Sequence, residues 1–243
     1  MPLHAQAIPI LSDNYAWLIR DEGTGATALV DPADADACIA AVQDAGGRLD
    51  LILLTHHHQD HIAGVDEVRA RYGCRVAGAA ADARRLPRLD QAVREGDTVE
   101  LGGSRLRVIE TPGHTVGHIS FAADGEAPVL LCGDTLFSLG CGRLLEGTAA
   151  DMFASLRKLA ALPPATLVCC GHEYTQSNAR FALHVDPTNQ ALRTRAAAVD
   201  RLRAAGLLTV PSLLGDELAE NPFLRAPTAD ALGALRSRKD QFR

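Results

Sequence analysis

The chain has 243 residues, of which 47% are apolar and 22% are charged, so it can bury a large core and is not a disordered chain. The formal net charge is −6 and no lysine- or arginine-rich tract occurs, which disfavours nucleic acid as the main partner. No apolar run is long enough to span a membrane and no signal peptide is recognisable, so we expect a cytoplasmic protein that does not bind membranes.

The first 47 residues predict strands followed by a helix. Strand-forming residues cluster in 4–11, 14–21 and 25–32, with turn-forming residues between them. Residues 33–47 have helical periodicity, with Asp34 or Asp36 near the start and two glycines beyond the end. We therefore expect neighbouring strands in one sheet and then a helix that leads into the next strand.

A continuous aliphatic run at 51–54 ends in the sequence THHHQDH. Such a run is typical of a strand that is buried on both faces of a sheet. In extended backbone the side chains of His56, His58 and Asp60 would point the same way, and His61 follows where the chain must turn. The cluster predicts a metal site at the end of this strand.

Further apolar segments also end near polar side chains. A helix is predicted at 64–72, a short strand at 74–80, and a surface connection over the polar residues 80–98. The later strand candidates, 104–115, 117–124, 127–137 and 165–174, place His114, His118, Asp134 and His172 at or near their ends. A helix is predicted at 150–162, before the last strand.

From residue 174 onward we expect helices and no strand. Helical periodicity occurs in 178–185, 190–206 and 229–243, and prolines separate these segments. The sequence therefore predicts an α/β domain over residues 1–173, with two sheets flanked by helices, and a helical domain over residues 174–243.

Six cysteines occur without a CxxC pair, and three of them lie inside apolar strand-like runs. Disulfide frameworks belong mainly to small secreted chains, so buried free thiols are expected here.

The strand ends supply more metal ligands than one catalytic ion uses. Catalytic zinc binds three protein ligands and a water, so the seven candidates divide into two sets of three with one shared carboxylate. Asp134 is the natural bridge because a carboxylate has two oxygens. The candidates are His56, His58, Asp60, His61, His114, Asp134 and His172.

Two divalent ions about 3.5 to 4 Å apart can hold a bridging hydroxide at neutral pH, which is hydrolase chemistry. We expect Zn²⁺, although this mixed nitrogen and oxygen set also suits iron or manganese. Asp134 and Asp60 are the expected catalytic carboxylates, with the metal-bridged hydroxide as the nucleophile. His57 and His118 are candidates for supporting or purely structural roles, and no role is expected for His4 and His184.

These residues resemble the metallo-β-lactamase superfamily. The motifs THHHQDH, TPGHT, CGDTLF and CGHEY carry the resemblance, which spans most of residues 1–173. It implies an αββα sandwich with the metals at one edge of the sheets. It also implies one metal on His56, His58 and His114, a second metal on Asp60, His61 and His172, and Asp134 between them.

The rest of the chain resembles the glyoxalase II (hydroxyacylglutathione hydrolase) family. The segments GDTLFSLGCGRLLEGTAADM, GHEYTQSNARFALHVDPTN, ENPFLR and RSRKDQF carry this likeness over nearly the full length. It implies that the loop after Asp134 and the C-terminal helices bind glutathione, and its motifs place the binders at Arg143, Tyr174, Arg236 and Lys239. One departure occurs at Leu145, where many relatives carry a tyrosine that helps to hold the tripeptide.

The resemblance implies hydrolysis of S-(2-hydroxyacyl)glutathione, chiefly S-D-lactoylglutathione, to glutathione and D-lactate, as in methylglyoxal detoxification. The expected partner is therefore a small-molecule thioester, and a monomer is expected. One alternative is a glutathione persulfide dioxygenase with a single iron. Another is a non-catalytic metal-binding protein built on the same fold, and an RNA-processing nuclease is disfavoured by the acidic balance.

Overall fold

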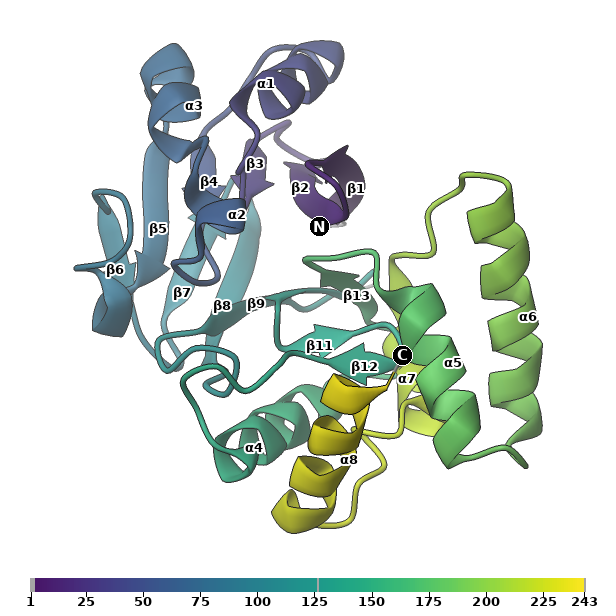
Figure 1. Ribbon diagram of the computed structural model, residues 1–243. Helices are drawn as coiled ribbons and strands as arrows, with labels where there is room; N and C mark the ends of the chain where they lie inside the picture. Colours follow the sequence, from purple (N-terminus) through teal and green to yellow (C-terminus); the bar gives the residue numbers. More distant parts are fainter. Residues whose placement is uncertain (1–2, 126, 243) are drawn as a thin grey trace.

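Two six-stranded β-sheets share one hydrophobic core in the computed structural model, which describes residues 3–125 and 127–242 (Figure 1). The first sheet has the spatial order β1 (Leu3–Ile10), β2 (Asn14–Asp21), β3 (Thr27–Val30), β4 (Leu51–Leu53), β5 (Arg75–Ala79) and β6 (Gln91–Val93). The second has the order β14 (Ser212–Leu213), β13 (Leu167–Cys170), β10 (Val129–Gly133), β9 (Ile119–Ala123), β8 (Ser104–Glu110) and β7 (Thr98–Leu101).

Helices cover the outer sides of the two sheets. α1 (Ala35–Asp44) and α3 (Val65–Tyr72) pack together on the first sheet, and α4 (Ala149–Ala160) and α8 (Ala229–Gln241) pack together below the second (Figure 1). The other helices are α2 (Gln59–Ile62), the 3₁₀ turn η1 (Ala80–Asp82), α5 (Thr175–Val185), α6 (Gln190–Ala204) and α7 (Leu214–Glu220). The predicted αββα sandwich with C-terminal helices is confirmed.

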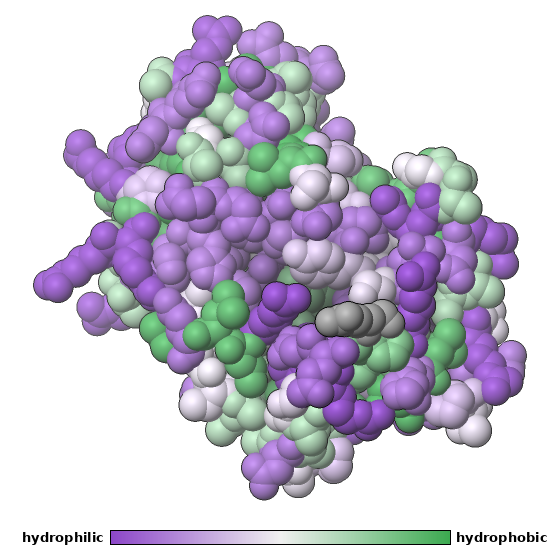
Figure 2. Space-filling view, viewed as in Figure 1, coloured by the Kyte–Doolittle hydropathy of each residue, from purple (hydrophilic) through white to green (hydrophobic). Residues whose placement is uncertain are grey.

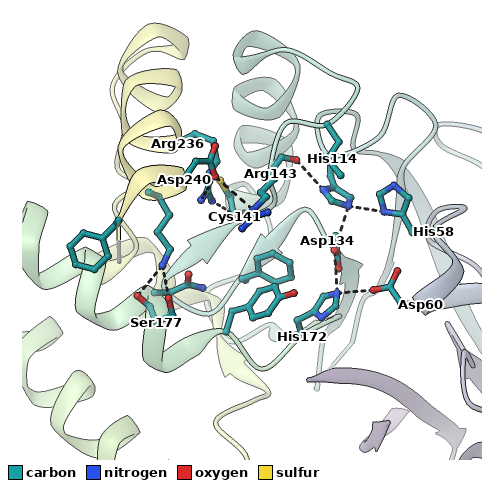
Figure 3. A pocket seen from close by; sticks show the side chains of 16 residues that line it. His58, Asp60, His114, Asp134, Cys141, Arg143, His172, Ser177, Arg236 and Asp240 are labelled. Atoms are coloured by element: carbon teal, nitrogen blue, oxygen red, sulfur yellow. Dashed lines mark hydrogen bonds and ion pairs between the residues drawn. The ribbon is translucent and has the colours of Figure 1, made fainter. Parts of the chain in front are cut away.

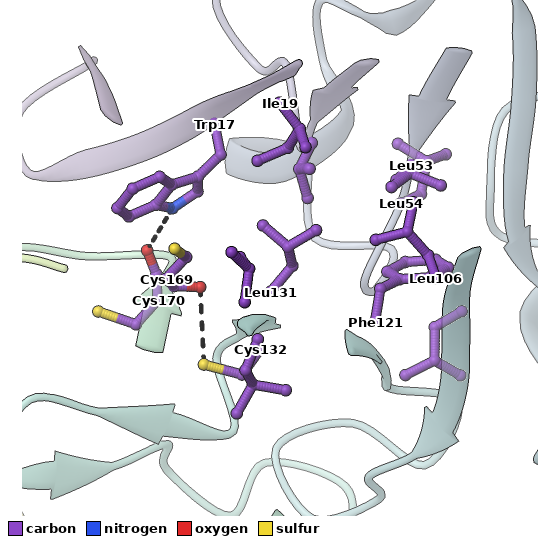
Figure 4. Packing of buried hydrophobic residues seen from close by; sticks show 14 of the residues in the cluster. Trp17, Ile19, Leu53, Leu54, Leu106, Phe121, Leu131, Cys132, Cys169 and Cys170 are labelled. Carbon is purple, nitrogen blue, oxygen red and sulfur yellow. Dashed lines mark hydrogen bonds between the residues drawn. The ribbon is translucent and has the colours of Figure 1, made fainter. Parts of the chain in front are cut away.

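The core between the sheets is made by the apolar strand residues that the sequence singles out. Leu53 of β4, Phe121 of β9 and Leu131 of β10 are fully buried and lie between the two layers (Figure 4). Trp17 of β2 donates its indole N–H to the carbonyl of Cys170 at 2.9 Å, which ties the first sheet to the second. All six cysteines are buried free thiols, as predicted.

Local signals set the helix ends that the sequence predicts. The Asp34 side chain accepts a hydrogen bond from the amide of Ala37 and begins α1. Gly73 ends α3 in the left-handed conformation, at φ 65°. No helix within residues 3–125 and 127–242 combines the length and apolarity needed to cross a membrane.

Three predictions about strands are wrong. Residues 80–98 are not only a surface connection, because β6 pairs with β5 there and β7 begins at Thr98. The segment after residue 174 contains a strand, because Ser212 and Leu213 of β14 pair with β13. The predicted strand 127–137 is broken at Asp134 into β10 and β11 (Leu136–Phe137). Strands of two to four residues are too short to show a period of two in sequence.

The C-terminal helices hold a small hairpin beside the second sheet. This hairpin consists of β11 and β12 (Gly140–Cys141), and Leu139 at its tip adopts φ 57°. The amide of Leu139 donates to Oε2 of the fully buried Glu217 at 2.8 Å. The side-chain amide of Asn221 donates to the carbonyls of Phe137 and Gly140. Helix α7 therefore fixes the hairpin that leads to Arg143.

Candidate metal centre and binding cleft

The seven predicted metal ligands lie together at one edge of the sandwich, beyond the carboxyl ends of strands. Figure 3 shows His58, Asp60, His114, Asp134 and His172 of this set. β4 is parallel to its neighbours in the first sheet, and β10 is parallel to β13 in the second, so these strands end at the same edge. His56, His58, Asp60 and His61 follow β4, His114 follows β8, Asp134 follows β10, and His172 follows β13.

The first cluster consists of His56, His58 and His114. Nδ1 of His58 lies 3.1 Å from Nε2 of His56 and 3.0 Å from Nε2 of His114. Three ring nitrogens, two from the segment after β4 and one from the loop after β8, therefore surround one point.

The second cluster consists of Asp60, His61 and His172. Nε2 of His61 lies 3.3 Å from Nε2 of His172, and Oδ2 of Asp60 lies 3.7 Å and 3.5 Å from these two nitrogens. The predicted extended backbone is wrong here, because His58 is the N-cap of α2 and Asp60 lies in its first turn. The helical turn, rather than alternation along a strand, brings Asp60 beside His61.

Asp134 lies between the two clusters. Its Oδ1 is 3.4 Å from Nε2 of His61, and its Oδ2 is 3.5 Å from Nε2 of His114 and 3.3 Å from Nε2 of His172. Oδ1 is buried and makes no hydrogen bond with any described residue. Gly171 leaves room beside it, because a Cβ atom there would lie 2.5 Å from this oxygen. A buried carboxylate oxygen without a partner in a ring of imidazoles fits a cation.

Hydrogen bonds from Nδ1 of His61, His172 and His114 orient these rings so that Nε2 of each faces the predicted metal positions. Nδ1–H of His61 donates to Oδ2 of Asp31 at 3.0 Å, and Nδ1–H of His172 donates to Oδ1 of Asp13 at 3.0 Å. Nδ1–H of His114 donates to the carbonyl of Arg143 at 2.9 Å. In the neutral form of each ring Nε2 is then the unprotonated nitrogen, so Nε2 of His61 and Nε2 of His172 repel each other at 3.3 Å unless a proton or a metal ion lies between them.

His56 is oriented through Thr55. The Thr55 hydroxyl donates to Oδ2 of Asp31 at 2.6 Å, so it accepts from Nδ1–H of His56 at 3.0 Å. Asp31 thus orients a histidine in each cluster: His61 directly and His56 through Thr55. It follows β3 and adopts φ 51°, a left-handed conformation that aspartate tolerates better than most residues. The side-chain amide of Asn14 donates to Oδ2 of Asp60 at 3.0 Å.

Asp13, Asn14 and Asp31 were not among the predicted site residues. The first two looked like ordinary turn residues. Asp31 could have been predicted from its position, because it is a polar residue directly after β3, the strand that runs parallel to β4.

The ionisation states of Asp134 and His56 suit a divalent cation. Burial alone would raise the pKa of Asp134, but the imidazoles of His61 and His172 outweigh burial and hold it well below its usual value. Burial and the neighbouring imidazoles lower the pKa of His56 well below its ordinary value. At neutral pH the first is therefore a carboxylate and the second a neutral imidazole, the forms that bind metal ions.

A cavity of about 460 Å³ extends from the metal centre to α8 (Figure 3). Arg143, Tyr174, Arg236 and Lys239, the four predicted glutathione binders, all line it. Hydrophilic side chains gather across the middle of this face of the molecule (Figure 2).

These four side chains are held differently. The Tyr174 ring stacks on His172 with ring centroids 4.6 Å apart, and it lines the cavity beside the predicted metal ligands. Lys239 donates to the carbonyl and the hydroxyl of Ser177. Arg143 is 72% exposed, whereas Arg236 is buried and donates to the carbonyl of Cys141 at 2.7 Å.

Comparison with known proteins gives a match for each of two consecutive parts of the chain. Residues 11–172 match the family model of the metallo-β-lactamase superfamily, and residues 173–242 match that of the hydroxyacylglutathione hydrolase C-terminus. The hydroxyacylglutathione hydrolase of Acidiphilium cryptum is 61% identical over 97% of this chain and 95% of its own length. That of Rhodospirillum rubrum is 56% identical over 94% of this chain and 89% of its own length. The chain belongs to the hydroxyacylglutathione hydrolase family.

Solved structures share the fold of this chain over most of its length. The crystal structure of ETHE1 from Myxococcus xanthus covers 98% of this chain and 90% of its own, with a TM-score of 0.73 and 26% identity. The structure of TTHA1623 in a di-iron-bound form covers 90% of this chain and 99% of its own, with a TM-score of 0.63 and 26% identity.

Of the two additional histidines, His57 and His118, the second contacts the predicted metal ligand Asp134 directly. The amide of Asp134 donates to Nε2 of the buried His118 at 3.1 Å, so Nδ1–H is free to donate to the hydroxyl of Thr111 or Thr135. His118 therefore positions Asp134. Nδ1 of His57 instead lies 2.9 Å from Oδ2 of Asp82, a residue that is not among the predicted metal ligands.

Replacing His118 with alanine is expected to weaken metal binding by about 10- to 100-fold, because Asp134 loses the acceptor that fixes its backbone. Chelator competition followed by metal analysis measures the change. His118→Gln keeps a side-chain acceptor and should recover part of the affinity. Equal metal affinity in the wild type and His118→Ala would contradict the positioning role.

Proposed function

We propose that this chain hydrolyses S-(2-hydroxyacyl)glutathione, chiefly S-D-lactoylglutathione, to glutathione and D-lactate. The observation that carries this proposal is the cavity itself. One end holds a buried carboxylate between two three-ligand clusters, and the other end holds cations that suit the two carboxylates of glutathione. The names of the close relatives support the same reaction.

Two divalent ions would bind at the inner end. His56, His58 and His114 would hold the first, Asp60, His61 and His172 the second, and Asp134 would contact both. Bound there, the ions would supply Lewis acidity and an activated water, the chemistry that thioester hydrolysis needs. We propose zinc, while iron or manganese also suits this donor set. The di-iron form of TTHA1623 supports a count of two.

The protein's own side chains bind and orient the thioester. Residues 174–243 supply Tyr174, Arg236 and Lys239 for the carrier, and residues 1–173 supply Arg143 and the metal ligands. The rings of Tyr174 and Phe137 lie edge to face and both contact His172, so they form the aromatic part of the cavity wall beside the metal ligands.

No cysteine is proposed as nucleophile. Cys141 lines the cavity, but burial raises the pKa of its thiol to about 11, so the thiolate is scarce at neutral pH. The glutathione thiolate is a good leaving group, so departure needs no strong general acid.

The direct test combines metal analysis with turnover of S-D-lactoylglutathione by the purified protein. We expect two ions per chain and release of free thiol at the rate of thioester loss. One ion per chain, with oxygen uptake in the presence of glutathione persulfide, would instead favour the dioxygenase. Bound metal without turnover of either compound would favour a non-catalytic protein.

Replacing Arg143 or Lys239 with alanine is expected to raise KM for the glutathione thioester with little change in kcat. The rise should be about three- to tenfold for the exposed Arg143 and about tenfold for the half-buried Lys239, as for the loss of one charge-assisted contact. Steady-state kinetics measures both constants. Arg201→Ala removes an exposed cation of α6 outside the cavity and should change neither. An unchanged KM for both variants would contradict this carrier site.

Carrier binding should also depend on the protonation of Lys239. Burial, then the nearby Arg236 and Arg143, lower the pKa of Lys239 to about 8, and Asp240 opposes them. Lys239 is therefore charged below this pH and neutral above it, so kcat/KM should fall as the pH rises from about 7 to about 9. Lys239→Arg keeps its charge throughout and should flatten this part of the profile. The same fall in Lys239→Arg would assign the titration to another group.

A further inference from the structure

Asp240 is an acidic residue at the carrier end of the cavity for which the proposed reaction gives no role. Three acidic side chains line the cavity, and two of them, Asp60 and Asp134, belong to the metal centre. Asp240 lies in the last turn of α8, beside Arg236 and Arg143 (Figure 3). It is the one carboxylate among the described lining residues that is not a predicted metal ligand.

Only one oxygen of Asp240 is engaged by its neighbours. Oδ1 lies 3.2 Å from Nε and 2.9 Å from Nη2 of Arg236, and 3.8 Å from Nε of Arg143. No hydrogen bond reaches Oδ2 from residues 3–125 or 127–242. The side chain is 42% exposed. Asp240 is therefore held in place through one oxygen, while the other is open to a donor in the cavity.

The charges at this end of the cavity mirror those of the carrier. Arg143, Arg236 and Lys239 are positive, and Asp240 is negative. Glutathione carries two carboxylates and one ammonium, the ammonium being on its γ-glutamyl residue. The three cations attract the carboxylates and repel the ammonium. Among the lining side chains at this end, Asp240 alone offers the ammonium an opposite charge.

We propose that Asp240 binds the γ-glutamyl ammonium of the carrier through Oδ2. The inference rests on the proposed function and names the part of the substrate that this end of the cavity selects. Asp240 would then distinguish glutathione from thiol carriers that have the same carboxylates but no amine at this position. Its bond to Arg236 also fixes the position of the free oxygen before the carrier binds.

A purely structural role for Asp240 makes a different prediction. If Asp240 only held Arg236 in place, its removal would weaken the binding of every anionic carrier alike. If Asp240 binds the ammonium, its removal affects only carriers that possess this group. Two substrates that differ in the ammonium alone therefore separate the two roles.

The experiment compares S-D-lactoylglutathione with the S-D-lactoyl thioester of glutaryl-cysteinyl-glycine, in which a hydrogen replaces the ammonium. The wild type is expected to prefer the first substrate by about three- to tenfold in kcat/KM, mainly through KM, as for one partly exposed ion pair. In Asp240→Asn the preference should fall to within about twofold. Asp230→Asn, at an exposed position in the first turn of the same helix, should keep it.

Equal use of the two substrates by the wild type would overturn the inference and leave the proposed function intact. An undiminished preference in Asp240→Asn, with activity on both substrates lowered alike, would assign Asp240 to holding Arg236. Absence of turnover of either thioester by the wild type would reject the proposed function and this inference with it.

Discussion

Replacing Asp134 with alanine is expected to remove nearly all thioesterase activity and most of the bound metal. Asp134 contacts both ligand clusters, with oxygen-to-nitrogen distances of 3.3–3.5 Å to His61, His114 and His172. Its loss would leave Asp60 as the one carboxylate among the seven predicted ligands to balance the charge of two divalent ions. We expect kcat/KM to fall by about three orders of magnitude or more, with fewer than two ions retained per chain. Kinetics and metal analysis of the same preparation measure both effects.

The control for this variant is Asp44→Ala. Asp44 is an exposed aspartate in the last turn of α1, so its replacement should keep both the metal and the activity. Circular dichroism should show that the Asp134 variant remains folded. Full metal content together with near-normal turnover in Asp134→Ala would contradict the shared carboxylate and the two-metal centre.

Replacing Glu217 with alanine is expected to cause the largest loss of stability. Glu217 is fully buried, pairs with Arg195 of α6, and accepts hydrogen bonds from Leu139 and Asn221. Its removal would leave the Arg195 guanidinium with Glu220 as its remaining carboxylate and the Leu139 amide without its acceptor. Breaking a buried ion pair from one side costs about 3–5 kcal/mol, which corresponds to a fall in Tm of roughly 6 to 20 °C for a chain of this size.

Asp216→Ala provides the matched control for Glu217. Asp216 precedes Glu217 in α7 but is exposed, so its loss should lower the free energy of unfolding by less than about 1 kcal/mol. Thermal unfolding of both variants, followed by circular dichroism, measures the difference. Similar midpoints for the two variants would show that the Arg195–Glu217 pair does not stabilise the hairpin and helices.

The strand ends that carry the candidate ligands could be found from the sequence because they follow continuous apolar runs. The run at 51–54 identified β4, and the strand ends after it carry His114, Asp134 and His172, because burial on both faces leaves an unbroken aliphatic pattern. The sequence did not predict β14 or the roles of Asp13 and Asn14, because both depend on contacts with segments that are distant in the sequence. β14 is two residues long and exists because β13 offers it an edge. The positions of Asp13 and Asn14 beside His172 and Asp60 depend on contacts between distant segments.

The short helix α2 shows why local pattern alone was insufficient for Asp60. A spacing of two residues suits an extended chain, yet the amides of His61 and Ile62 donate to the carbonyl of His58 and wind the segment into a turn. Both conformations place acidic and imidazole groups near one point, so the sequence predicted the composition of the cluster but not its backbone.

Arg143 joins the two ends of the cavity through different parts of one residue. Its backbone carbonyl accepts the hydrogen bond that orients His114, while its guanidinium lines the carrier end. Side-chain changes at position 143 can therefore alter carrier preference without disturbing the ring of His114. An insertion or deletion in the loop between Cys141 and Glu146 would move the carbonyl as well, so it would damage metal retention and carrier recognition together. Redesign of this enzyme for another thiol should vary the side chains of this loop and preserve its length.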